Sequence, residues 1–449
     1  MNKVAKRKIY FLGIGGIGMS ALARYFHKKG CVVLGYDKTE SPLTRKLEDE
    51  GILIHYEDNP NLLSDDIDLV IMTPAIPKDS MQLQWFKDNK IRITKRAEVL
   101  GELSRLTKSV AVAGTHGKTT VTAIVTHLLN YSGKRMSAFI GGIAKNINSN
   151  VIVGDENDEV MVMEADEFDR SFLHLSPYIS IVTSIDADHL DIYGDEQELV
   201  KSFNEFVAKT SENGVVIYNH KLPVTTDRKH LTYGFEDADV MARNLRIENA
   251  LTKFSLVTKE GVGLGEFEMR LYGKHNVMNA MAAIMACFQL KIDMKDIREG
   301  LATFKGVQRR FDIRYKDDEV CYIDDYAHHP EEIKASLSAV REIFPTKELT
   351  LVFQPHLFTR TRDFMDEFAD ALSQADKLIL MEIYPAREKP ISGITSSVLL
   401  DKISCKQKQI CQKDELLDVI QSSRPELLVT MGAGDIDRFV PSIEMLLQS

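Results

Sequence analysis

Residues 110–120 read Val-Ala-Val-Ala-Gly-Thr-His-Gly-Lys-Thr-Thr, a combination of apolar residues, glycines, lysine and threonine that suits phosphate binding. The apolar run predicts a strand that ends before Gly114, and the residues from Thr119 onward predict a helix. Backbone N–H groups freed by Gly114 and Gly117, together with the positive end of the helix dipole, favour a bound phosphate. In such a loop Lys118 reaches the terminal phosphates of a nucleotide and the Thr119 hydroxyl binds Mg²⁺.

The loop departs from the full Walker pattern at one position, because Val112 stands where the pattern has a glycine five residues before Gly117. A glycine-rich turn without a ligand is therefore an alternative interpretation of this segment. Its position between a strand and a helix favours nucleotide binding.

Two acidic segments follow strand-like runs in the same part of the chain. They read Glu-Ala-Asp-Glu-Phe-Asp over 164–169 and Asp-Ala-Asp-His-Leu-Asp over 186–191. In a doubly wound sheet the ends of these strands lie beside the phosphate loop, and carboxylate oxygens there suit Mg²⁺. His189, placed among three aspartates, is a candidate for metal or phosphate contact. The alternative for the segment 164–169 is a solvated acidic loop, and the alternative for His189 is a purely structural role.

A second glycine loop, Gly-Ile-Gly-Gly-Ile-Gly over 13–18, precedes a predicted helix near the N-terminus. With Asp37 nineteen residues after Gly18, it formally matches the dinucleotide-binding fingerprint. The fingerprint brings a pyrophosphate against the backbone and the helix N-terminus. A UDP-sugar carries a pyrophosphate just as NAD does, so this loop alone leaves both ligand classes open.

Four polar segments in the C-terminal third each follow an apolar run. They span 324–330, 353–362, 384–390 and 432–435. Because the carboxyl ends of parallel strands meet at one edge of an open α/β sheet, we expect the four segments to form a site there. A further segment, 273–279, precedes a predicted helix, and its Asn276 and Asn279 suit base contact and helix capping equally.

The overall pattern predicts an α/β protein of three domains, because strand-like runs alternate with helical periodicity from end to end. We expect a Rossmann-like domain over 1–107, a central P-loop ATPase-type domain over 108–310 and a second Rossmann-like domain over 311–449. The predicted strands lie at 9–14, 32–36, 69–72, 160–163, 179–183, 215–218, 320–323, 349–353, 378–382 and 427–431.

Composition narrows the function classes further. A net charge of -10 and a pI near 5.7 argue against a nucleic-acid-binding surface. The run Ile9–Ile14 is too short for a signal-peptide core or a membrane span. The five cysteines are scattered without metal-binding spacing, which is typical of a reducing compartment. We therefore expect a cytoplasmic protein, monomeric or homodimeric, without a nucleic-acid or membrane partner.

Taken together, the motifs resemble those of the Mur ligases of peptidoglycan synthesis, in the same order and over nearly the whole chain. Val112 in the phosphate loop is itself normal for that family. The matching segments are 13–20, 114–120, 164–167, 186–191, 273–276, 309–311 and 324–330.

This resemblance implies an ATP-dependent ligase that joins L-alanine to the lactyl carboxylate of UDP-N-acetylmuramate through an acyl phosphate. ATP is then a co-substrate and Mg²⁺ a cofactor. One alternative is the recycling ligase of the same fold, which attaches a preformed tripeptide. A remote alternative, from the glycine fingerprint alone, is an NAD-dependent oxidoreductase.

The resemblance also implies residue roles. Catalytic roles fall to Lys118, Glu164, His189, His328 and Arg360. ATP contacts fall to Gly114, Thr115, His116, Gly117, Lys118, Thr119, Thr120, Asn279 and Arg310, and Mg²⁺ binding to Thr119, Glu164 and His189. The backbone amides of Gly15, Gly16 and Ile17, together with Asp37, are implied to bind the UDP group. His328 and Arg360 are implied to bind alanine. Leu357 stands where relatives often have an arginine, which leaves Arg360 as the main candidate for the alanine carboxylate.

Overall fold

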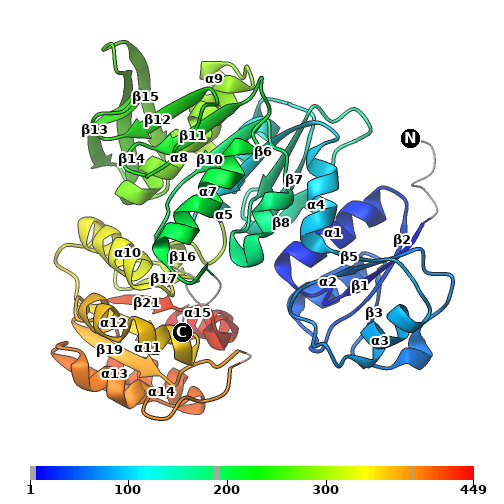
Figure 1. Ribbon diagram of the computed structural model, residues 1–449. Helices are drawn as coiled ribbons and strands as arrows, with labels where there is room; N and C mark the ends of the chain where they lie inside the picture. The colour runs from blue at the N-terminus through cyan, green and yellow to red at the C-terminus, as the bar shows by residue number, and fades with distance from the viewer. Residues whose placement is uncertain (1–6, 187–192, 387, 449) are drawn as a thin grey trace. The chain divides into compact units, whose positions relative to one another are not determined.

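The computed structural model describes residues 7–186, 193–386 and 388–448 and contains three β-sheets (Figure 1). The chain divides into two compact units. The first unit comprises residues 1–246, 253–269 and 278–305, and the second comprises 247–252, 270–277 and 306–449. The first two sheets belong to the first unit, except for residues 247–252 where two strands of the second sheet meet, and the third sheet belongs to the second unit. The predicted α/β class is confirmed.

The first sheet is parallel and has the strand order β3-β2-β1-β4-β5 of a Rossmann-like domain. Its strands are β1 (Lys8–Leu12), β2 (Val32–Tyr36), β3 (Leu53–His55), β4 (Leu69–Met72) and β5 (Ile93–Lys95). Its helices are α1 (Ile17–Lys28), η1 (Pro60–Leu62), α2 (Pro42–Asp49), α3 (Met81–Asp88) and α4 (Arg96–Ser104). The strand order reverses at β1, and the glycine loop after β1 lies at this reversal, where such sheets bind ligands.

The second sheet has ten strands in the order β15-β14-β13-β12-β11-β10-β6-β9-β7-β8. Its parallel centre consists of β6 (Lys108–Ala113), β7 (Met136–Ala144), β9 (Val160–Glu164), β10 (Ile179–Val182) and β11 (Val215–Asn219). The helices of this part are α5 (Lys118–Tyr131), η2 (Phe168–His174), α7 (Glu196–Ala208), α8 (Lys274–Gln289) and α9 (Met294–Thr303). The predicted helix after the phosphate loop is α5, which packs on β6, β7 and β9.

Further strands extend both edges of the second sheet. At one edge β8 (Ser149–Ile152) is antiparallel to β7. At the other edge β12 (His230–Gly234) is parallel to β11 and β13 (Val240–Glu248) is parallel to β12, and β14 (Leu251–Thr258) and β15 (Gly263–Met269) follow. Asn249 and Ala250 join β13 to β14 with φ angles of 52° and 58°, the left-handed conformation of a tight hairpin turn. Such short connections cannot cross over a sheet, so they add antiparallel neighbours.

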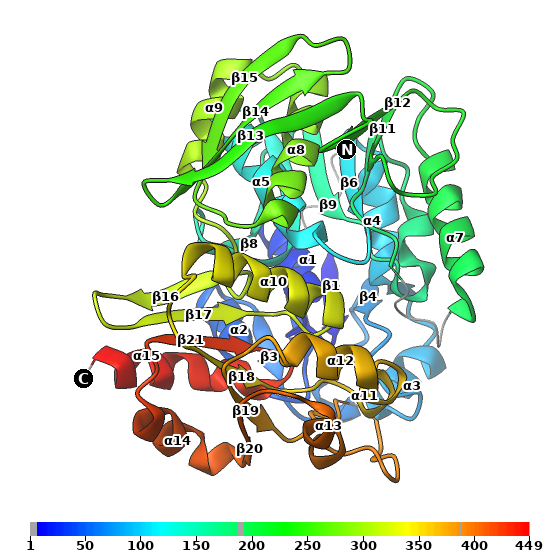
Figure 2. The ribbon, with the colours of Figure 1, turned by 90° about the vertical axis from the view of Figure 1, so that its left-hand side faces the viewer.

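The third sheet has the order β16-β17-β21-β18-β19-β20, with β16 alone antiparallel to its neighbour within the described residues (Figure 2). Its strands are β16 (Asp312–Lys316), β17 (Cys321–Asp325), β18 (Leu349–Phe353), β19 (Lys377–Met381), β20 (Gln407–Cys411) and β21 (Leu427–Met431). Its helices are α10 (Pro330–Ile343), α11 (Phe358–Asp363), α12 (Met365–Leu372), α13 (Ser396–Lys402), η3 (Lys413–Glu415), α14 (Leu416–Ser423), η4 (Asp435–Phe439) and α15 (Val440–Gln448). Separate apolar clusters cover its two faces, as a sheet with helices on both sides requires.

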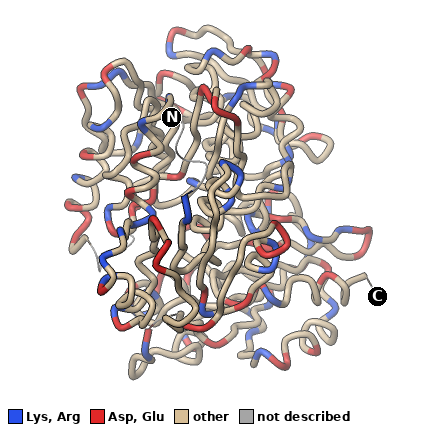
Figure 3. The backbone as a smooth tube through the Cα atoms, turned by 90° about the vertical axis from the view of Figure 1, so that its right-hand side faces the viewer, with Lys and Arg blue, Asp and Glu red and all other residues tan. Residues whose placement is uncertain are grey.

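Charged residues of both signs are interspersed along the chain (Figure 3). None of the helices in the described ranges combines the length and the apolar character needed to cross a membrane. The five cysteines are all buried and none forms a disulfide.

Candidate active site

The loop after β6 has the conformation of a phosphate-binding loop. Gly114 and Gly117 have φ angles of 139° and 83°, which L-residues with side chains rarely adopt. A Cβ at Gly114 would overlap the Thr183 hydroxyl, and one at Gly117 would lie 2.5 Å from the Asn279 amide oxygen. Glycine is therefore required at both positions, and Gly117 directly precedes α5, whose N-terminus faces the loop.

Lys118 lies inside this loop and is held by a carboxylate that the sequence did not single out. Its ammonium donates to Glu167 Oε1 at 2.8 Å and to the carbonyl oxygens of Gly114 and Thr115. The two side chains are 17% and 2% exposed, respectively, so this is a largely buried ion pair. Burial alone would lower the pKa of Lys118, but the negative charge of Glu167 and its acidic neighbours outweighs burial and raises it. Lys118 is therefore a cation.

The loop after β10 packs directly on the phosphate loop. The Ser184 hydroxyl accepts from the His116 backbone N–H at 2.8 Å and lies 2.8 Å from the Thr115 hydroxyl. The Asp186 backbone N–H donates to the Thr115 hydroxyl at 3.0 Å, and the Asp186 carboxylate lies 3.6 Å from His116 Nε2. These contacts fix the start of the Asp-His segment beside the nucleotide loop. His189 itself lies outside the described residues.

The acidic segment 164–169 does not form one shared cluster, because each of its four acids has its own partner. These pairs are Glu164 with the Gly141 N–H, Asp166 with Arg96, Glu167 with Lys118, and Asp169 with Lys95. Among the described residues no three His, Cys, Asp or Glu side chains are grouped as a metal site. A solvated acidic loop does not describe this segment, since three of the four acids pair with basic residues far along the chain.

Glu164 and Thr119 are the two predicted Mg²⁺ ligands that the structure describes. In the parallel pairing of β6 and β9, Glu164 lies opposite Val112, two residues before the phosphate loop begins. Thr119 is buried in the first turn of α5. A carboxylate and a hydroxyl are hard oxygen donors, and Mg²⁺ typically takes only one or two protein carboxylates and completes its shell with phosphate oxygens and water. The described residues therefore fit this ion.

The glycine loop after β1 is organised by Asp37. The Gly15 N–H donates to Asp37 Oδ2 at 2.8 Å, and a Cβ at Gly15 would lie at the same distance from that oxygen. The expected UDP contact of the Gly15 amide is thus engaged by Asp37 in this structure. Gly16 precedes α1, and the first turn of α1, which starts at Ile17, carries no acidic residue. This helix N-terminus keeps the positive potential that an anion needs.

In the second unit, the polar segments predicted to converge do so at the carboxyl edge of the third sheet. The Gln354 side-chain amide donates to Asp435 at 2.8 Å, which joins the segments after β18 and β21. The His356 ring stacks on Tyr384, with centroids 5.8 Å apart, which joins the segments after β18 and β19. The His328 ring meets His356 edge-on at 6.1 Å, which adds the segment after β17.

Glu332, in the first turn of α10, organises the residues around His328. Its carboxylate accepts the backbone N–H of His328 at 3.0 Å, lies 3.3 Å from His328 Nδ1 and pairs with Arg310 at 3.9 Å. The Arg310 guanidinium also lies over the Tyr326 ring, 4.9 Å from its centroid. Glu332 was not predicted from the sequence, although its position three residues after His329 is the spacing of a capping box.

The electrostatics keep His328 neutral. Burial lowers its pKa to about 3, and the charge of Arg360 adds to this effect while Glu332 opposes it. Arg360 is buried in the short helix α11, and Leu357 precedes that helix with a φ of 73°. A positive φ is uncommon for a residue other than glycine, and such strain is often found at functional sites. The second unit therefore presents a neutral imidazole and a permanent cation at one sheet edge.

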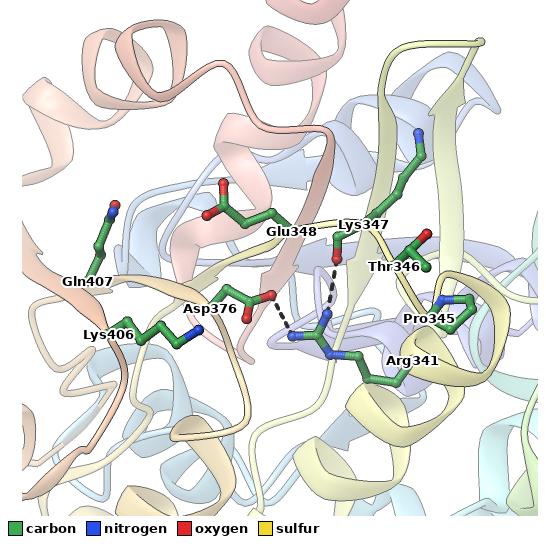
Figure 4. A pocket seen from close by; sticks show the side chains of 8 residues that line it. All are labelled: Arg341, Pro345, Thr346, Lys347, Glu348, Asp376, Lys406 and Gln407. Atoms are coloured by element: carbon green, nitrogen blue, oxygen red, sulfur yellow. Dashed lines mark hydrogen bonds and ion pairs between the residues drawn. The ribbon is translucent and has the colours of Figure 1, made fainter.

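A separate pocket of about 270 Å³ lies at the opposite, amino end of the third sheet (Figure 4). It is lined by Arg341, Pro345, Thr346, Lys347, Glu348, Asp376, Lys406 and Gln407. Arg341 donates to Asp376 at 2.7 Å and to the Lys347 carbonyl oxygen at 3.0 Å, so its charge is already used within the fold. Because ligands of open α/β sheets bind at the carboxyl end, we do not assign the reaction to this pocket.

The fold and these sites define a class of protein, namely a nucleotide-binding α/β protein with a P-loop sheet and two further α/β sheets. Three family models match in succession along the chain. They are described as Mur ligase family, catalytic domain (residues 8–108), Mur ligase middle domain (112–287) and Mur ligase, glutamate ligase domain (309–434).

Individual relatives agree over nearly the full chain. The UDP-N-acetylmuramate–L-alanine ligase of Christiangramia forsetii is 47% identical, with 98% of each chain covered. The enzyme of the same name from Flavobacterium johnsoniae is 48% identical and covers 100% of this chain and 99% of its own. The crystal structure of the UDP-N-acetylmuramate-alanine ligase of Thermotoga maritima is 30% identical, with a TM-score of 0.86 and coverage of 98% and 99%. This chain belongs to the Mur ligase family.

Proposed function

We propose that this protein catalyses the ATP-dependent ligation of L-alanine to the lactyl carboxylate of UDP-N-acetylmuramate, the first amino-acid addition in peptidoglycan precursor synthesis. The observation that carries the proposal is the full-length similarity to ligases of that name, at 47% and 48% identity. The phosphate loop with its buried lysine supports the ATP-dependent half of the reaction. Both nucleotide substrates are cytoplasmic metabolites, so we place the reaction in the cytoplasm.

The proposed reaction has two balanced steps. The lactyl carboxylate attacks the γ-phosphate of ATP, which forms an acyl phosphate and releases ADP. The amine of L-alanine then attacks the acyl carbon, and the tetrahedral intermediate collapses to an amide and inorganic phosphate. Phosphoryl transfer depends mainly on positioning and charge neutralisation, and amide formation depends on holding the amine beside the activated carbonyl.

Residues of the second sheet are assigned to ATP. The Lys118 ammonium would leave Glu167 and contact the β- and γ-phosphates. The backbone amides of 114–120 would donate hydrogen bonds to the phosphate oxygens. Thr119 and Glu164 would bind Mg²⁺, which supplies further charge neutralisation. His189 remains a proposed ligand on sequence resemblance alone. Asn279, whose amide oxygen limits the space at Gly117, and Arg310 are assigned to ATP as well.

The other two sheets are assigned to the remaining substrates. The amides of Gly16 and Ile17 would bind the pyrophosphate of the UDP-sugar. Asp37 shapes the loop through Gly15 and would contact the uridine. His328 and Arg360 would bind alanine. Because His328 is neutral, Arg360 supplies the positive charge for the alanine carboxylate. Under this proposal the three domains 1–107, 108–310 and 311–449 bind UDP-sugar, ATP and alanine respectively.

The proposal is tested by phosphate release in a coupled assay with purified protein. Release should require ATP, UDP-N-acetylmuramate, L-alanine and Mg²⁺ together, and omission of any one should return the rate to background. Glycine and L-serine replace L-alanine in parallel reactions to measure selectivity. Phosphate release without the UDP-sugar would mean that another acceptor is used, and the proposal would be abandoned.

A second candidate is tested in the same assay. The murein peptide ligase of Psychrobacter arcticus shares the fold, with a TM-score of 0.73 at 23% identity. Turnover with a preformed tripeptide but not with L-alanine would favour that activity. Calorimetry with NAD tests the remaining interpretation of the glycine fingerprint, and tight NAD binding without a response to UDP-N-acetylmuramate would support an oxidoreductase instead.

A further inference from the structure

The third glycine of the N-terminal loop makes room for an arginine from another element. A Cβ at Gly18 would overlap Arg96 Nη1 and would lie 3.2 Å from Arg96 Cζ. The three atoms nearest to that position all belong to Arg96, so the guanidinium lies directly against the first turn of α1. In the dinucleotide fingerprint the third glycine allows close packing of helix on strand. In this protein the neighbour of Gly18 is a charged side chain, that of the first residue of α4.

Arg96 is held in this position from one side. Its Nη2 donates to Asp166 Oδ2 at 2.8 Å, and the side chain is 24% exposed. Across the described residues this is the one hydrogen bond that the guanidinium makes, although the group has five N–H donors. Asp166 belongs to the loop that carries Glu164, so Arg96 connects the two glycine-loop sheets within the first unit.

The surroundings of the Arg96 guanidinium carry positive potential from helix N-termini. Arg96 is the first residue of α4, and its guanidinium also faces the first turn of α1, so it lies near the positive ends of two helix dipoles. Glu98 in the first turn of α4 and Asp166 are the acids that offset this charge, and α1 has no acid in its first turn. A guanidinium against a helix N-terminus is suited to a phosphate group, which it can bind through two parallel N–H groups.

We propose that Arg96 is a substrate-binding residue that contacts the pyrophosphate of the UDP-sugar from the α4 side of the loop 13–18, and that Asp166 and Gly18 position it. This inference rests on the proposed function, because it takes the loop 13–18 as the UDP-sugar site. It assigns to Gly18 the role of admitting the guanidinium. Asp166 then acts at the UDP-sugar site, because it positions Arg96, and it is not a metal ligand.

The first measurement is the Kd of UDP-N-acetylmuramate for the full-length wild-type protein, by calorimetry without ATP. Absence of binding there would contradict the proposed function itself. Given binding, Arg96→Ala should raise the Kd by about 10-fold to 100-fold, because a hydrogen bond to a charged group is lost together with its charge. The Kd of ATP should not change. Equal UDP-sugar affinity in the variant and the wild type would overturn the inference alone.

Gly18→Ala provides a sharper test, because it moves the guanidinium without removing it. Gly18 does not have a positive φ, alanine is a better helix former than glycine, and only the far end of the Arg96 side chain must move, so this variant should fold. Its UDP-sugar Kd should nevertheless rise, and Gly18→Ala should add nothing in an Arg96→Ala background. Additive effects of the two substitutions would show that Gly18 acts independently of Arg96 and would overturn the assignment.

Lys95→Ala is the matched control, because Lys95, the N-cap residue of α4, forms the neighbouring ion pair with Asp169 of η2 at 3.5 Å. If these pairs only join the start of α4 to the segment 164–169, both variants should leave the UDP-sugar Kd unchanged, and Arg96→Ala should lower the melting temperature more because its pair is less exposed. UDP-N-acetylglucosamine has the pyrophosphate but lacks the lactyl carboxylate, so Arg96→Ala should weaken both nucleotide sugars by the same factor. Weakening of UDP-N-acetylmuramate alone would assign Arg96 to the carboxylate and reject the pyrophosphate contact.

Discussion

Lys118→Ala is expected to remove turnover and also to destabilise the protein, for two separable reasons. Loss of one donor aimed at a transferring phosphoryl group typically costs roughly 2.7–4 kcal/mol of transition-state stabilisation, a factor of about 10²–10³ in rate. The structure adds the second effect, because Lys118 is the partner of Glu167, whose side chain is 2% exposed. Alanine at position 118 leaves that carboxylate buried without its cation.

The size of the second effect follows from the protonation of Glu167. Removing one member of a buried ion pair costs about 3–5 kcal/mol. The carboxyl group can escape part of this by taking up a proton, and protonating a glutamate of ordinary pKa at pH 7 costs about 3.7 kcal/mol. Burial already raises the pKa of Glu167 against the opposing effect of Lys118. We therefore expect a loss of about 3–4 kcal/mol in the free energy of unfolding at pH 7.

The free energy of unfolding of Lys118→Ala should depend on pH through the proton on Glu167. In the variant the folded state holds a proton on Glu167 at pH values where the unfolded chain has lost it, so the free energy of unfolding falls as pH rises above about 4.3. The deficit relative to the wild type should grow by up to about 1.4 kcal/mol per pH unit between pH 5 and pH 7. Lowering the pH should therefore rescue the stability of the variant but not its turnover.

The assay is denaturant unfolding at pH 5.5 and pH 7 together with phosphate release, for Lys118→Ala, Glu167→Gln and the double variant. Glutamine has the shape of the glutamate without its charge, so the double variant should recover most of the stability and none of the activity. Wild-type turnover in folded Lys118→Ala would refute the assignment of the phosphate loop. A stability loss that is independent of pH, or that remains in the double variant, would refute the role of Glu167.

Two further predictions concern the third sheet. Arg360→Lys should raise the KM for L-alanine far more than those for ATP and UDP-N-acetylmuramate, because an ammonium cannot reproduce the planar two-point contact with a carboxylate. Arg360→Ala should nearly abolish alanine use, at about 2–5 kcal/mol for truncation of a buried charge pair. An unchanged alanine KM, with only a lower melting temperature, would instead make Arg360 structural. Since the pKa of His328 is about 3, its imidazole is neutral from pH 5 to pH 8, and His328→Asn should lower kcat/KM for alanine by the same factor at every pH in that range. A factor that changes with pH would mean that His328 titrates there.

Much of the scaffold was predictable because its determinants are local. The strands at 32–36, 69–72, 349–353 and 427–431 have the predicted bounds, since short apolar runs between turn residues are characteristic of buried parallel strands. The convergence of polar segments on one edge of the third sheet was predictable for a geometric reason. Parallel strands place their carboxyl ends at the same edge, and the contact of Gln354 with Asp435 follows from that arrangement.

The strands at the edges of the second sheet, β8 and β12 to β15, were not predicted from the sequence. The segments that form β12 to β15 carry many charged and polar residues, because β13 and β15 are largely exposed. An exposed strand has little apolar alternation to distinguish it from a loop, and its pairing with a neighbour decides that it is a strand. These strands were therefore determined by hydrogen bonding across the sheet rather than by their own composition.

The sequence by itself determined which residues are able to bind phosphate, through glycine spacing, one lysine and the strand-to-helix turns that present them. Only the tertiary structure decided how the charges pair. Lys118 meets Glu167 across 49 residues, Arg96 meets Asp166 across 70, and Gly18 admits Arg96 from a different helix. Local propensity is encoded over a few residues, whereas the partner of a charged side chain depends on which elements the packing of the sheets brings together.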